Sequence, residues 1–342
     1  MRNYKQGYRL FVKMKIFNLY LDTMILIGFL NGWVEYGFLI LKNIKRDSKR
    51  HNLSFLSILY NSLIKYPILG FLPIDFFCYR LYKNNYKEYI SYIEFYSKLI
   101  RRSFYFSDSI GNKFFFKKSI MKKIRTPKLI AYYNHKNGKI IKFAHPNTSK
   151  IVLKPSCGTL GNDIKVVKSD SYIKVIKKSK KSSIAEEFIK QHNFLNDIYS
   201  ESVNTLRILT LKKNRDILVI KGTLKVGRIP NVKVDNVAKG GIGINLDMKT
   251  GILGKGYTAY KYGFIEYNSH PKTNFLFYGK TVPFLEDAKN IAIEAHRCFP
   301  KFTIVGWDIA LTETGPMLVE GNTFPNITGM QLHEPLKDKL LN

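Results

Sequence analysis

Cysteine is scarce in this chain. Cys78, Cys157 and Cys298 are widely spaced in a sequence of 342 residues. They form no C-x-x-C pair and none of the Cys/His spacings typical of zinc sites, which argues against a structural zinc module. Few, scattered cysteines suit a reducing compartment, so we expect a cytoplasmic protein.

Acidic residues are also few. Only 25 Asp and Glu stand against 56 Lys and Arg, giving a formal net charge of +31. The abundance of Lys, Ile, Asn, Tyr and Phe is typical of AT-rich coding and accounts for part of this excess. A positive field still attracts polyanions such as nucleotides, nucleic acids and anionic membranes. The basic residues are dispersed, and no RRM, KH or zinc-knuckle signature is present, which argues against a nucleic-acid-binding module.

Long uninterrupted hydrophobic runs are missing as well. Residues 21–41 are rich in Ile, Leu, Phe and Trp, but Asp22, Asn31 and Glu35 interrupt them and no small-residue cleavage site follows. A second apolar stretch, residues 55–82, contains lysine, proline and aspartate. Two interpretations stay open for both stretches: core-facing amphipathic helices, or interfacial helices lying on anionic lipid.

The apolar pattern of residues 1–105 predicts helices. Apolar residues recur there at three- and four-residue spacing, most regularly over residues 88–99, and no catalytic motif is present. An apolar content of 45% and this length are sufficient for two or three structural units. We expect a helical N-terminal region over residues 1–105 and a second domain over residues 106–342.

The most informative stretch is residues 304–322, which read I-V-G-W-D-I-A-L-T-E-T-G-P-M-L-V-E-G-N. Two apolar runs flank a Gly-Pro turn, a pattern that predicts a hairpin. Glu320 and Asn322 share a face of their strand, and the hairpin brings Asp308 beside them. Burying these oxygen atoms together is costly unless a cation such as Mg²⁺ binds them, together with substrate phosphates. A surface hairpin with acidic ends explains the same pattern.

A second informative stretch begins at Lys154, where an apolar strand leads into K-P-S-C-G-T-L-G-N. Glycines let backbone N–H groups approach phosphate oxygens, and the lysine adds a point charge. The stretch is not a P-loop, because no G-K-[ST] follows and no helix begins there. An ordinary hairpin turn is the alternative.

Arg207 lies within the apolar strand S-V-N-T-L-R-I-L-T-L of residues 202–211. A guanidinium inside such a strand needs an anion, which is either a structural carboxylate or a bound ligand. Upstream, the pattern of residues 184–189 predicts a short strand that leads into the carboxylates of Glu186 and Glu187.

Taken in order, these pieces resemble the ATP-grasp superfamily, and most closely its sugar-transfer-associated branch, related to alpha-L-glutamate ligases. The resemblance covers about residues 106–335. Its motifs are K-P-x-x-G-x-x-G-N from Lys154, E-E-F-I-K-Q-H from Glu186, S-V-N-T-L-R-I from Ser202, V-D-N-x-x-K-G-G from Val234, H-P-K-T from His270 and G-W-D-I-A…G-P-x-L-V-E-G-N from Gly306.

The resemblance implies an α+β fold, the ATP-grasp fold, in which two α+β subdomains grip ATP behind the helical N-terminal region. The nucleotide subdomain is expected at about residues 106–190 and the catalytic, metal-binding subdomain at about residues 191–335. It also implies a reaction in which a carboxylate attacks the γ-phosphate and an amine or similar nucleophile then displaces phosphate from the acylphosphate. The implied cofactors are ATP and Mg²⁺, with Mn²⁺ as a substitute.

The resemblance also assigns roles to individual residues. Lys154 contacts the phosphates and Arg207 neutralises the transferring phosphate, so both are catalytic candidates. Asp308, Glu320 and Asn322 become the metal ligands. The remaining nucleotide contacts are Lys113, the loop residues Ser156, Gly158 and Gly161, and the hinge residues Glu186, Glu187, Phe188 and Ile189, whose backbone faces adenine.

The chain departs from the family at its N-terminus. Many ATP-grasp enzymes begin with a Rossmann-like domain that helps to bind the acceptor, whereas residues 1–105 are typical of helices. Lys225, Arg228 and Asn236 are therefore only candidates for acceptor binding. The residue that holds ribose stays open among His192, Asn193 and Asp197.

The expected function is an ATP-dependent carboxylate–amine ligase that modifies a cell-surface polysaccharide, glycan or peptide. Its expected partners are ATP and unknown carboxylate and amine acceptors, sugar- or lipid-linked ones among them. The positive charge is suited to a cytoplasmic position at the anionic inner membrane face. Two alternatives remain, a kinase on the same fold and a non-enzymatic, basic nucleic-acid-binding protein.

Overall fold

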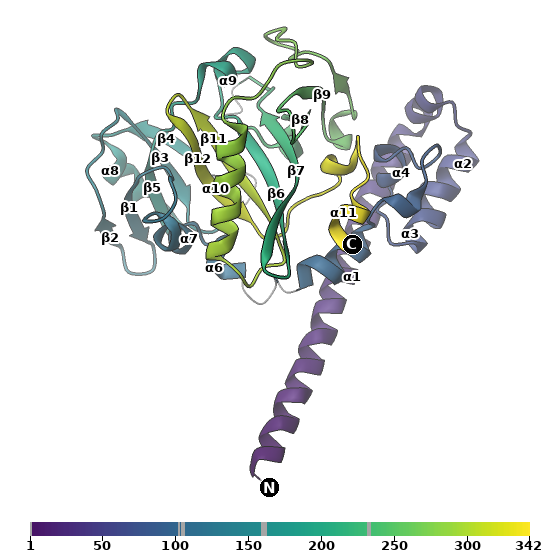
Figure 1. Ribbon diagram of the computed structural model, residues 1–342, viewed down its shortest axis with the longest axis horizontal. Helices are drawn as coiled ribbons and strands as arrows, with labels where there is room; N and C mark the ends of the chain where they lie inside the picture. Colours follow the sequence, from purple (N-terminus) through teal and green to yellow (C-terminus); the bar gives the residue numbers. More distant parts are fainter. Residues whose placement is uncertain (1, 102, 104–106, 159–162, 231–233) are drawn as a thin grey trace. The chain divides into compact units, whose positions relative to one another are not determined.

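The computed structural model of the chain divides into two compact units. Unit 1 consists of Met1–Tyr105 with Ile327–Asn342, and unit 2 consists of Phe106–Asn326 (Figure 1). The structure describes residues 2–101, 103, 107–158, 163–230 and 234–342.

Unit 1 is helical, as the apolar periodicity predicts. The expected helix over residues 88–99 begins later, at Tyr92, because the Ser91 hydroxyl accepts a hydrogen bond from the Glu94 backbone N–H (3.3 Å) and caps the helix there. The N-terminal part of the unit contains α1 (Arg2–His51), α2 (Phe55–Tyr60), η1 (Asn61–Lys65), α3 (Tyr66–Ile68), α4 (Asp75–Cys78), η2 (Tyr86–Glu88), α5 (Tyr92–Phe95) and η3 (Tyr96–Ile100).

The C-terminal segment packs with these helices. It contains η7 (Gly329–Gln331) and α11 (Lys337–Leu341). The buried Gln331 amide donates a hydrogen bond to Ile90 O and accepts one from Ile90 N, both at 3.1 Å. The sequence places residues 327–342 in the second domain, and the structure groups them with unit 1 because their partners lie about 240 residues upstream.

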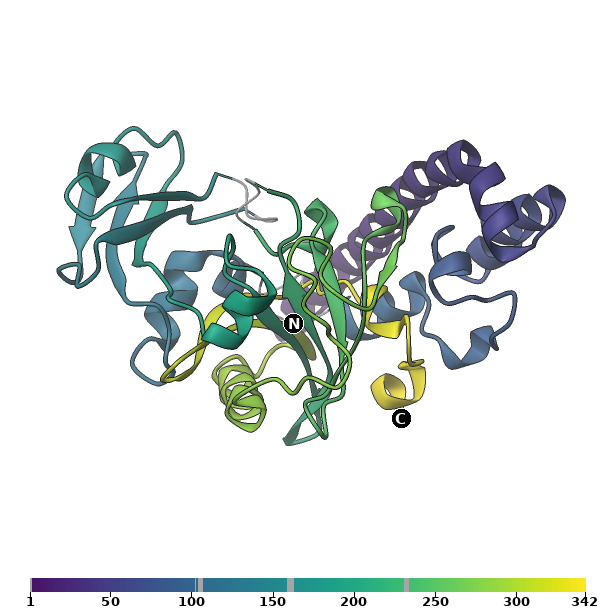
Figure 2. The ribbon, with the colours of Figure 1, turned by 90° about the horizontal axis from the view of Figure 1, so that it is seen from above.

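Unit 2 is built on two antiparallel sheets. The five-stranded sheet has the order β2-β1-β5-β3-β4, from β1 (Leu129–Asn134), β2 (Lys139–Lys142), β3 (Lys150–Pro155), β4 (Lys165–Lys168) and β5 (Ser183–Glu187). The seven-stranded sheet has the order β10-β9-β8-β7-β6-β11-β12, from β6 (Thr205–Lys213), β7 (Asp216–Val226), β8 (Ile242–Leu246), β9 (Leu253–Tyr257), β10 (Glu266–Tyr267), β11 (Ile304–Thr312) and β12 (Gly315–Asn322). Figures 1 and 2 show the two sheets beside each other.

Helices complete unit 2. They are α6 (Ser107–Gly111), α7 (Lys113–Ile120), α8 (Tyr172–Ile176), α9 (Asn193–Ile198), α10 (Leu285–Cys298) and the 3₁₀ turns η5 (Val237–Lys239) and η6 (Tyr260–Tyr262). The helix α10 lies across the seven-stranded sheet (Figure 1). Its buried Ala288, Ala292 and Ala295 form an apolar stripe, and their small side chains let the helix approach the strands closely.

Trp307 anchors β11 to the core beneath α10. Its indole N–H donates to the Thr210 hydroxyl (2.8 Å), and that hydroxyl contacts the His296 ring at 2.7 Å. All residues of β11 are buried, so the strand is covered on both faces. Successive strand residues point to opposite faces, and Asp308 therefore faces away from the α10 core.

Candidate active site

The acidic hairpin predicted from the sequence is present. β11 and β12 pair antiparallel, with Asp308 opposite Glu320 and Gly306 opposite Asn322. The register shifts between Asp308 and Ile309, where the strand has a bulge or irregularity. The structure therefore brings together the three oxygen-bearing side chains that the sequence singled out.

Asp308 is held by two cations, one from the adjacent strand β6 and one from β7, the strand beyond it. The Arg207 guanidinium, on β6, binds both carboxylate oxygens, with Nη2 at 2.7 Å from Oδ2. Lys225 Nζ, on β7, lies 3.0 Å from Oδ2. Burial opposes ionisation of Asp308, but Arg207 and Lys225 hold the pKa of this carboxyl well below its usual range. The structural-carboxylate alternative for Arg207 is thus what the structure contains, and its role toward phosphate stays a prediction.

The pKa of the Glu320 carboxyl is shifted in the opposite direction. Burial, and then the charge of Asp308 across the hairpin, raise the pKa of the Glu320 carboxyl above its usual value. Its nearest cation is Lys113, with Nζ 3.9 Å from Oε2. Like charges directly opposite each other on paired strands are destabilising. The hairpin therefore keeps an unfavourable pair of carboxylates that an additional cation would relieve.

The donor set of the hairpin fits Mg²⁺ in its chemistry. Among the described residues the Asn322 amide nitrogen is buried with no hydrogen-bond partner, so no hydrogen bond of this nitrogen fixes the orientation of the amide, whose oxygen can serve as a cation ligand. Because Asp308 already serves Arg207 and Lys225, Glu320 and Asn322 are the side chains most available as ligands. Mg²⁺ is commonly held by one or two carboxylates plus phosphates and water. The three-residue metal assignment stays a prediction.

A buried ion triad lies between β3, β5 and α7. Glu186 forms an ion pair with Lys117 through one carboxylate oxygen and with Lys154 through the other, each with an N···O distance of 2.8 Å. Lys117 Nζ also donates to Pro127 O at 3.1 Å. Burial penalises the charged carboxylate, but the two lysines hold the pKa of Glu186 at about 2. Glu186 therefore orients Lys154, and its side chain is not directed at a nucleotide base.

Sequence reasoning missed Lys117. Burial lowers the pKa of Lys117 to about 8, with Glu186 acting in the other direction. The signal was present, because Lys117 is three residues from both Phe114 and Ile120 on the buried face of α7. A lysine on the apolar face of an amphipathic helix implies a buried counter-charge.

Lys113 and the loop after β3 contact each other. Lys113 Nζ donates to Gly158 O and its backbone N–H donates to Ser156 O, both at 2.7 Å. The Ser156 backbone N–H and hydroxyl both donate to Ser182 O, at 2.8 and 3.0 Å. Gly158 has a φ of +141°, which suits glycine. Gly161, the other loop glycine assigned to phosphate, lies outside the described residues.

The expected hinge follows the end of β5. Glu187 Oε1 accepts the Asn147 backbone N–H at 2.9 Å, so this side chain secures a neighbouring loop. The Phe188 backbone N–H donates to Lys150 O at 3.3 Å, and the Lys150 ammonium lies 5.6 Å from the Phe188 ring centre. The assignment of Glu186, Glu187, Phe188 and Ile189 to adenine is a prediction.

The acceptor candidates are only partly brought together. Arg228 donates to Gly240 O at 2.7 Å, and the Asn236 side chain caps η5 by accepting the Ala238 N–H at 2.8 Å, so both have local structural partners. Lys225 reaches the site through Asp308 and lies 3.5 Å from Asp235, a residue that the sequence analysis passed over. Asp235 accepts the Thr205 hydroxyl, and burial raises the pKa of its carboxyl.

Gly241 holds the chain around Asp235 in place. A Cβ at this position would lie 2.6 Å from Asp235 O and 2.8 Å from Val226 O, both backbone atoms that cannot move aside cheaply. Replacing Gly241 with Ala is expected to lower the free energy of unfolding by about 1–3 kcal/mol, measured by urea denaturation. Gly111→Ala is the control, because no atom lies within 4 Å of its Cβ, and it should change stability by no more than about 0.5 kcal/mol. Equal stability of the two variants would contradict this packing.

Comparison with known families identifies a family for the C-terminal half of the chain. Residues 175–342 match the family model described as sugar-transfer associated ATP-grasp. Residues 175–342 therefore belong to the ATP-grasp superfamily, in its sugar-transfer-associated branch, within an α+β fold that helices precede. The resemblance inferred from the motifs and the predicted fold class are both confirmed.

Similar solved structures include three ligases or synthetases. They are an L-amino acid ligase from Bacillus licheniformis (13% identity, TM-score 0.40, 65% of this chain and 42% of that one), an N5-carboxyaminoimidazole ribonucleotide synthetase from Thermotoga maritima (13%, 0.38, 66% and 45%) and a D-alanine–D-alanine ligase from Bacillus anthracis complexed with ATP (15%, 0.37, 68% and 60%). The chain spans about half the length of these structures. The comparison with curated proteins finds no match.

Proposed function

We propose that this chain is an ATP- and Mg²⁺-dependent ligase that joins a carboxylate to an amine or a similar nucleophile. One observation carries the proposal. Basic side chains from both sheets and from α7 place their positive charges around the carboxylates of Asp308 and Glu320. These residues are Lys113, Lys154, Arg207 and Lys225. A carboxylate pair surrounded by cations suits a metal-bound polyphosphate better than it suits a neutral ligand.

Different residues are proposed to bind the nucleotide phosphates and the metal ion. Lys154, oriented by Glu186, and Lys113, beside the Gly158 loop, supply positive charge for the nucleotide phosphates. Glu320 and Asn322 would hold Mg²⁺, which would supply positive charge to neutralise the phosphates. Arg207 lies on Asp308 at the edge of this group, where it can move to the transferring phosphoryl group.

The proposed reaction has two steps. A carboxylate oxygen of the acceptor attacks the γ-phosphorus, the bond from that phosphorus to the bridging oxygen breaks, and ADP leaves. The amine nitrogen then attacks the acyl carbon, the acyl C–O bond breaks, inorganic phosphate leaves and the amine loses a proton. The protein contributes positioning and charge neutralisation, which are the main catalytic effects available in phosphoryl transfer.

For the acceptor we propose only a chemical class. The family description, sugar-transfer associated, supports a carboxylate or an amine on a sugar, a glycan or a peptide linked to one. The net charge of +31 favours an anionic acceptor as well as ATP. Polysaccharide modification in the cytoplasm is the setting that these two observations support.

The test is a screen of amino acids and sugar acids for acceptor-dependent phosphate release with Mg-ATP, followed by mass spectrometry of the product. A ligase releases one phosphate per new amide and leaves none on the product. Phosphate retained on the acceptor would instead identify a kinase. If calorimetry shows that the purified chain does not bind Mg-ATP, both the ligase and the kinase proposals are wrong.

A further inference from the structure

The helix α1 has one packed face and one exposed apolar face. Leu21, Ile25 and Phe29 are buried against the rest of unit 1. The opposite face carries large apolar side chains that remain about 40–70% exposed: Met24, Ile27, Leu30, Val34, Phe38 and Leu41. α1 is also long and apolar enough to cross a membrane by length and composition, yet only 22% of its most apolar window is buried.

A second exposed stripe follows along α2, η1 and α3. Leu56, Tyr60, Ile64 and Ile68 recur every four residues and are all more than half exposed, Leu56 and Ile68 by nearly 80%. This spacing places them on one side of the helical segment. Soluble proteins rarely expose apolar patches larger than a few hundred Å², and larger ones mark interaction surfaces.

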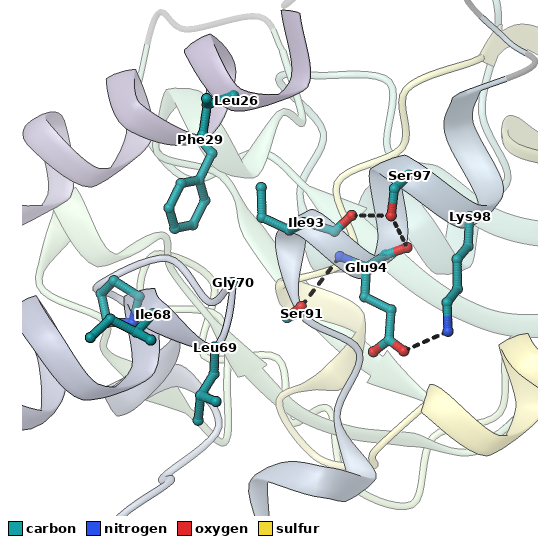
Figure 3. Close-up of a pocket in the computed structure, with 11 residues that line it drawn as sticks. Leu26, Phe29, Ile68, Leu69, Gly70, Ser91, Ile93, Glu94, Ser97 and Lys98 are labelled. Carbon is teal, nitrogen blue, oxygen red and sulfur yellow. Dashed lines mark hydrogen bonds and ion pairs between the residues drawn. The ribbon is translucent and has the colours of Figure 1, made fainter. Parts of the chain in front are cut away.

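A pocket of about 660 Å³ lies between α1 and the segment that follows η1. Leu26 and Phe29 of α1 line one side, and Ile68 and Leu69 line the other (Figure 3). The Lys98–Glu94 ion pair (2.8 Å) lies at the polar side of the same pocket. We call the two exposed stripes together the apolar face of unit 1.

Exposed lysines border this face. Lys42, Lys45 and Lys49 follow the apolar stretch along α1, and Lys65 lies between Ile64 and Tyr66. The acidic Asp22 is neutralised by Arg101 at 3.1 Å. Apolar side chains bordered by lysines complement a surface with anionic head groups over hydrocarbon.

We infer that the apolar face of unit 1 docks on an anionic lipid bilayer, with α1 lying in the plane of the interface. The packed face of α1 is covered by unit 1 itself, so the helix can offer lipid one face only, as an interfacial helix does and a lone spanning helix does not. Of the two interpretations that the sequence left open, this assigns the interfacial one. The inference is independent of the proposed ligase chemistry.

The test is flotation of the purified full-length chain with preformed vesicles. Vesicles of phosphatidylcholine with phosphatidylglycerol should carry the protein upward, and about 1 M salt, where the Debye length falls to about 3 Å, should release most of it. The triple variant Leu30→Gln, Val34→Gln, Phe38→Gln should bind at least tenfold more weakly. The triple variant Lys42→Gln, Lys45→Gln, Lys49→Gln should bind the anionic vesicles roughly 100-fold more weakly.

Matched controls alter the same residue types on unit 2. Leu276→Gln with Tyr278→Gln removes exposed apolar side chains there, and Lys136→Gln with Lys139→Gln and Lys142→Gln removes exposed charges. Both control variants should float like the wild type. Absence of flotation at low salt would overturn the inference. So would equal binding to purely neutral vesicles, or a stable dimer by light scattering that the Leu30, Val34, Phe38 variant dissociates, since a second copy would then occupy the face.

Discussion

Replacing Glu186 with Gln is expected to lower the free energy of unfolding by about 3–5 kcal/mol, the largest stability effect we foresee in this chain. The Lys117 and Glu186 side chains are each only 1% exposed and their charged atoms lie 2.8 Å apart. The variant leaves Lys117 buried without its counter-charge, facing only Pro127 O and a neutral amide. The measurement is the urea unfolding midpoint at neutral pH. A change below about 1 kcal/mol would show that water or a rearranged partner replaces the carboxylate.

Glu187→Gln is the matched control. Glu187 is the next residue of β5, its side chain is 19% exposed and its cation, Lys128, lies 3.8 Å away. A partly exposed pair of this length contributes little, so this variant should lose less than about 1 kcal/mol. A loss equal to that of Glu186→Gln would mean that the strand is sensitive to any change and not to the ion triad.

The pH dependence of stability provides an independent check on Glu186. Its folded pKa of about 2 lies below the usual value of 4.5, because Lys117 and Lys154 outweigh the cost of burial. The unfolded chain therefore binds the proton first, and the stabilisation is fully present above about pH 4.5 and is lost as the pH falls toward 2. The wild type should lose more stability across this window than Glu186→Gln does.

Replacing Glu320 with Gln is expected to reduce Mg-ATP-dependent turnover by at least 10²–10³-fold while leaving the fold intact or more stable. The reason is that Glu320 lies opposite Asp308, its pKa is raised by burial and by that charge, and its nearest cation is 3.9 Å away. Removing the charge relieves repulsion in the free protein but removes a ligand from the proposed metal site. The measurements are turnover with a responsive acceptor and thermal unfolding without Mg²⁺.

Opposite signs for activity and stability distinguish a metal ligand from a structural residue. Asp287→Asn, an exposed acid on α10, should leave both quantities nearly unchanged. Because metal binding needs the ionised Glu320 and its folded pKa is raised, Mg²⁺ affinity should fall as the pH is lowered toward that pKa. Unchanged Mg²⁺ affinity in Glu320→Gln would remove this residue from the metal site.

The two predictions describe one arrangement of charge. Two lysines balance the negative charge of Glu186, which in turn orients Lys154. The negative charge of Glu320 is balanced less well, and its pKa is raised. Asp308 resembles Glu186 in this respect, because Arg207 and Lys225 occupy both of its oxygens. The ion triad around Glu186 is therefore expected to contribute most to stability, and Glu320 and Asn322 are expected to bind the additional cation.

The sequence alone predicted the acidic hairpin and the ATP-grasp fold. A hairpin is a local object, because alternating apolar residues and a Gly-Pro turn specify its strands, and its register then places Asp308 opposite Glu320. The order of the motifs identified the superfamily for the same reason, since each motif is a short continuous stretch. Strand β5 also appeared close to where the apolar pattern predicts it.

Only the tertiary structure decided which charges pair. Arg207 and Asp308 are 101 positions apart and become partners because β6 and β11 are neighbours in one sheet. Lys117 reaches Glu186 because α7 packs against β5, and Gln331 joins residues 327–342 to the helices through Ile90. Periodicity records which face of an element is buried but not which element covers it. The sequence therefore determined the elements and their chemistry, and the packing between elements decided the partner of each buried charge.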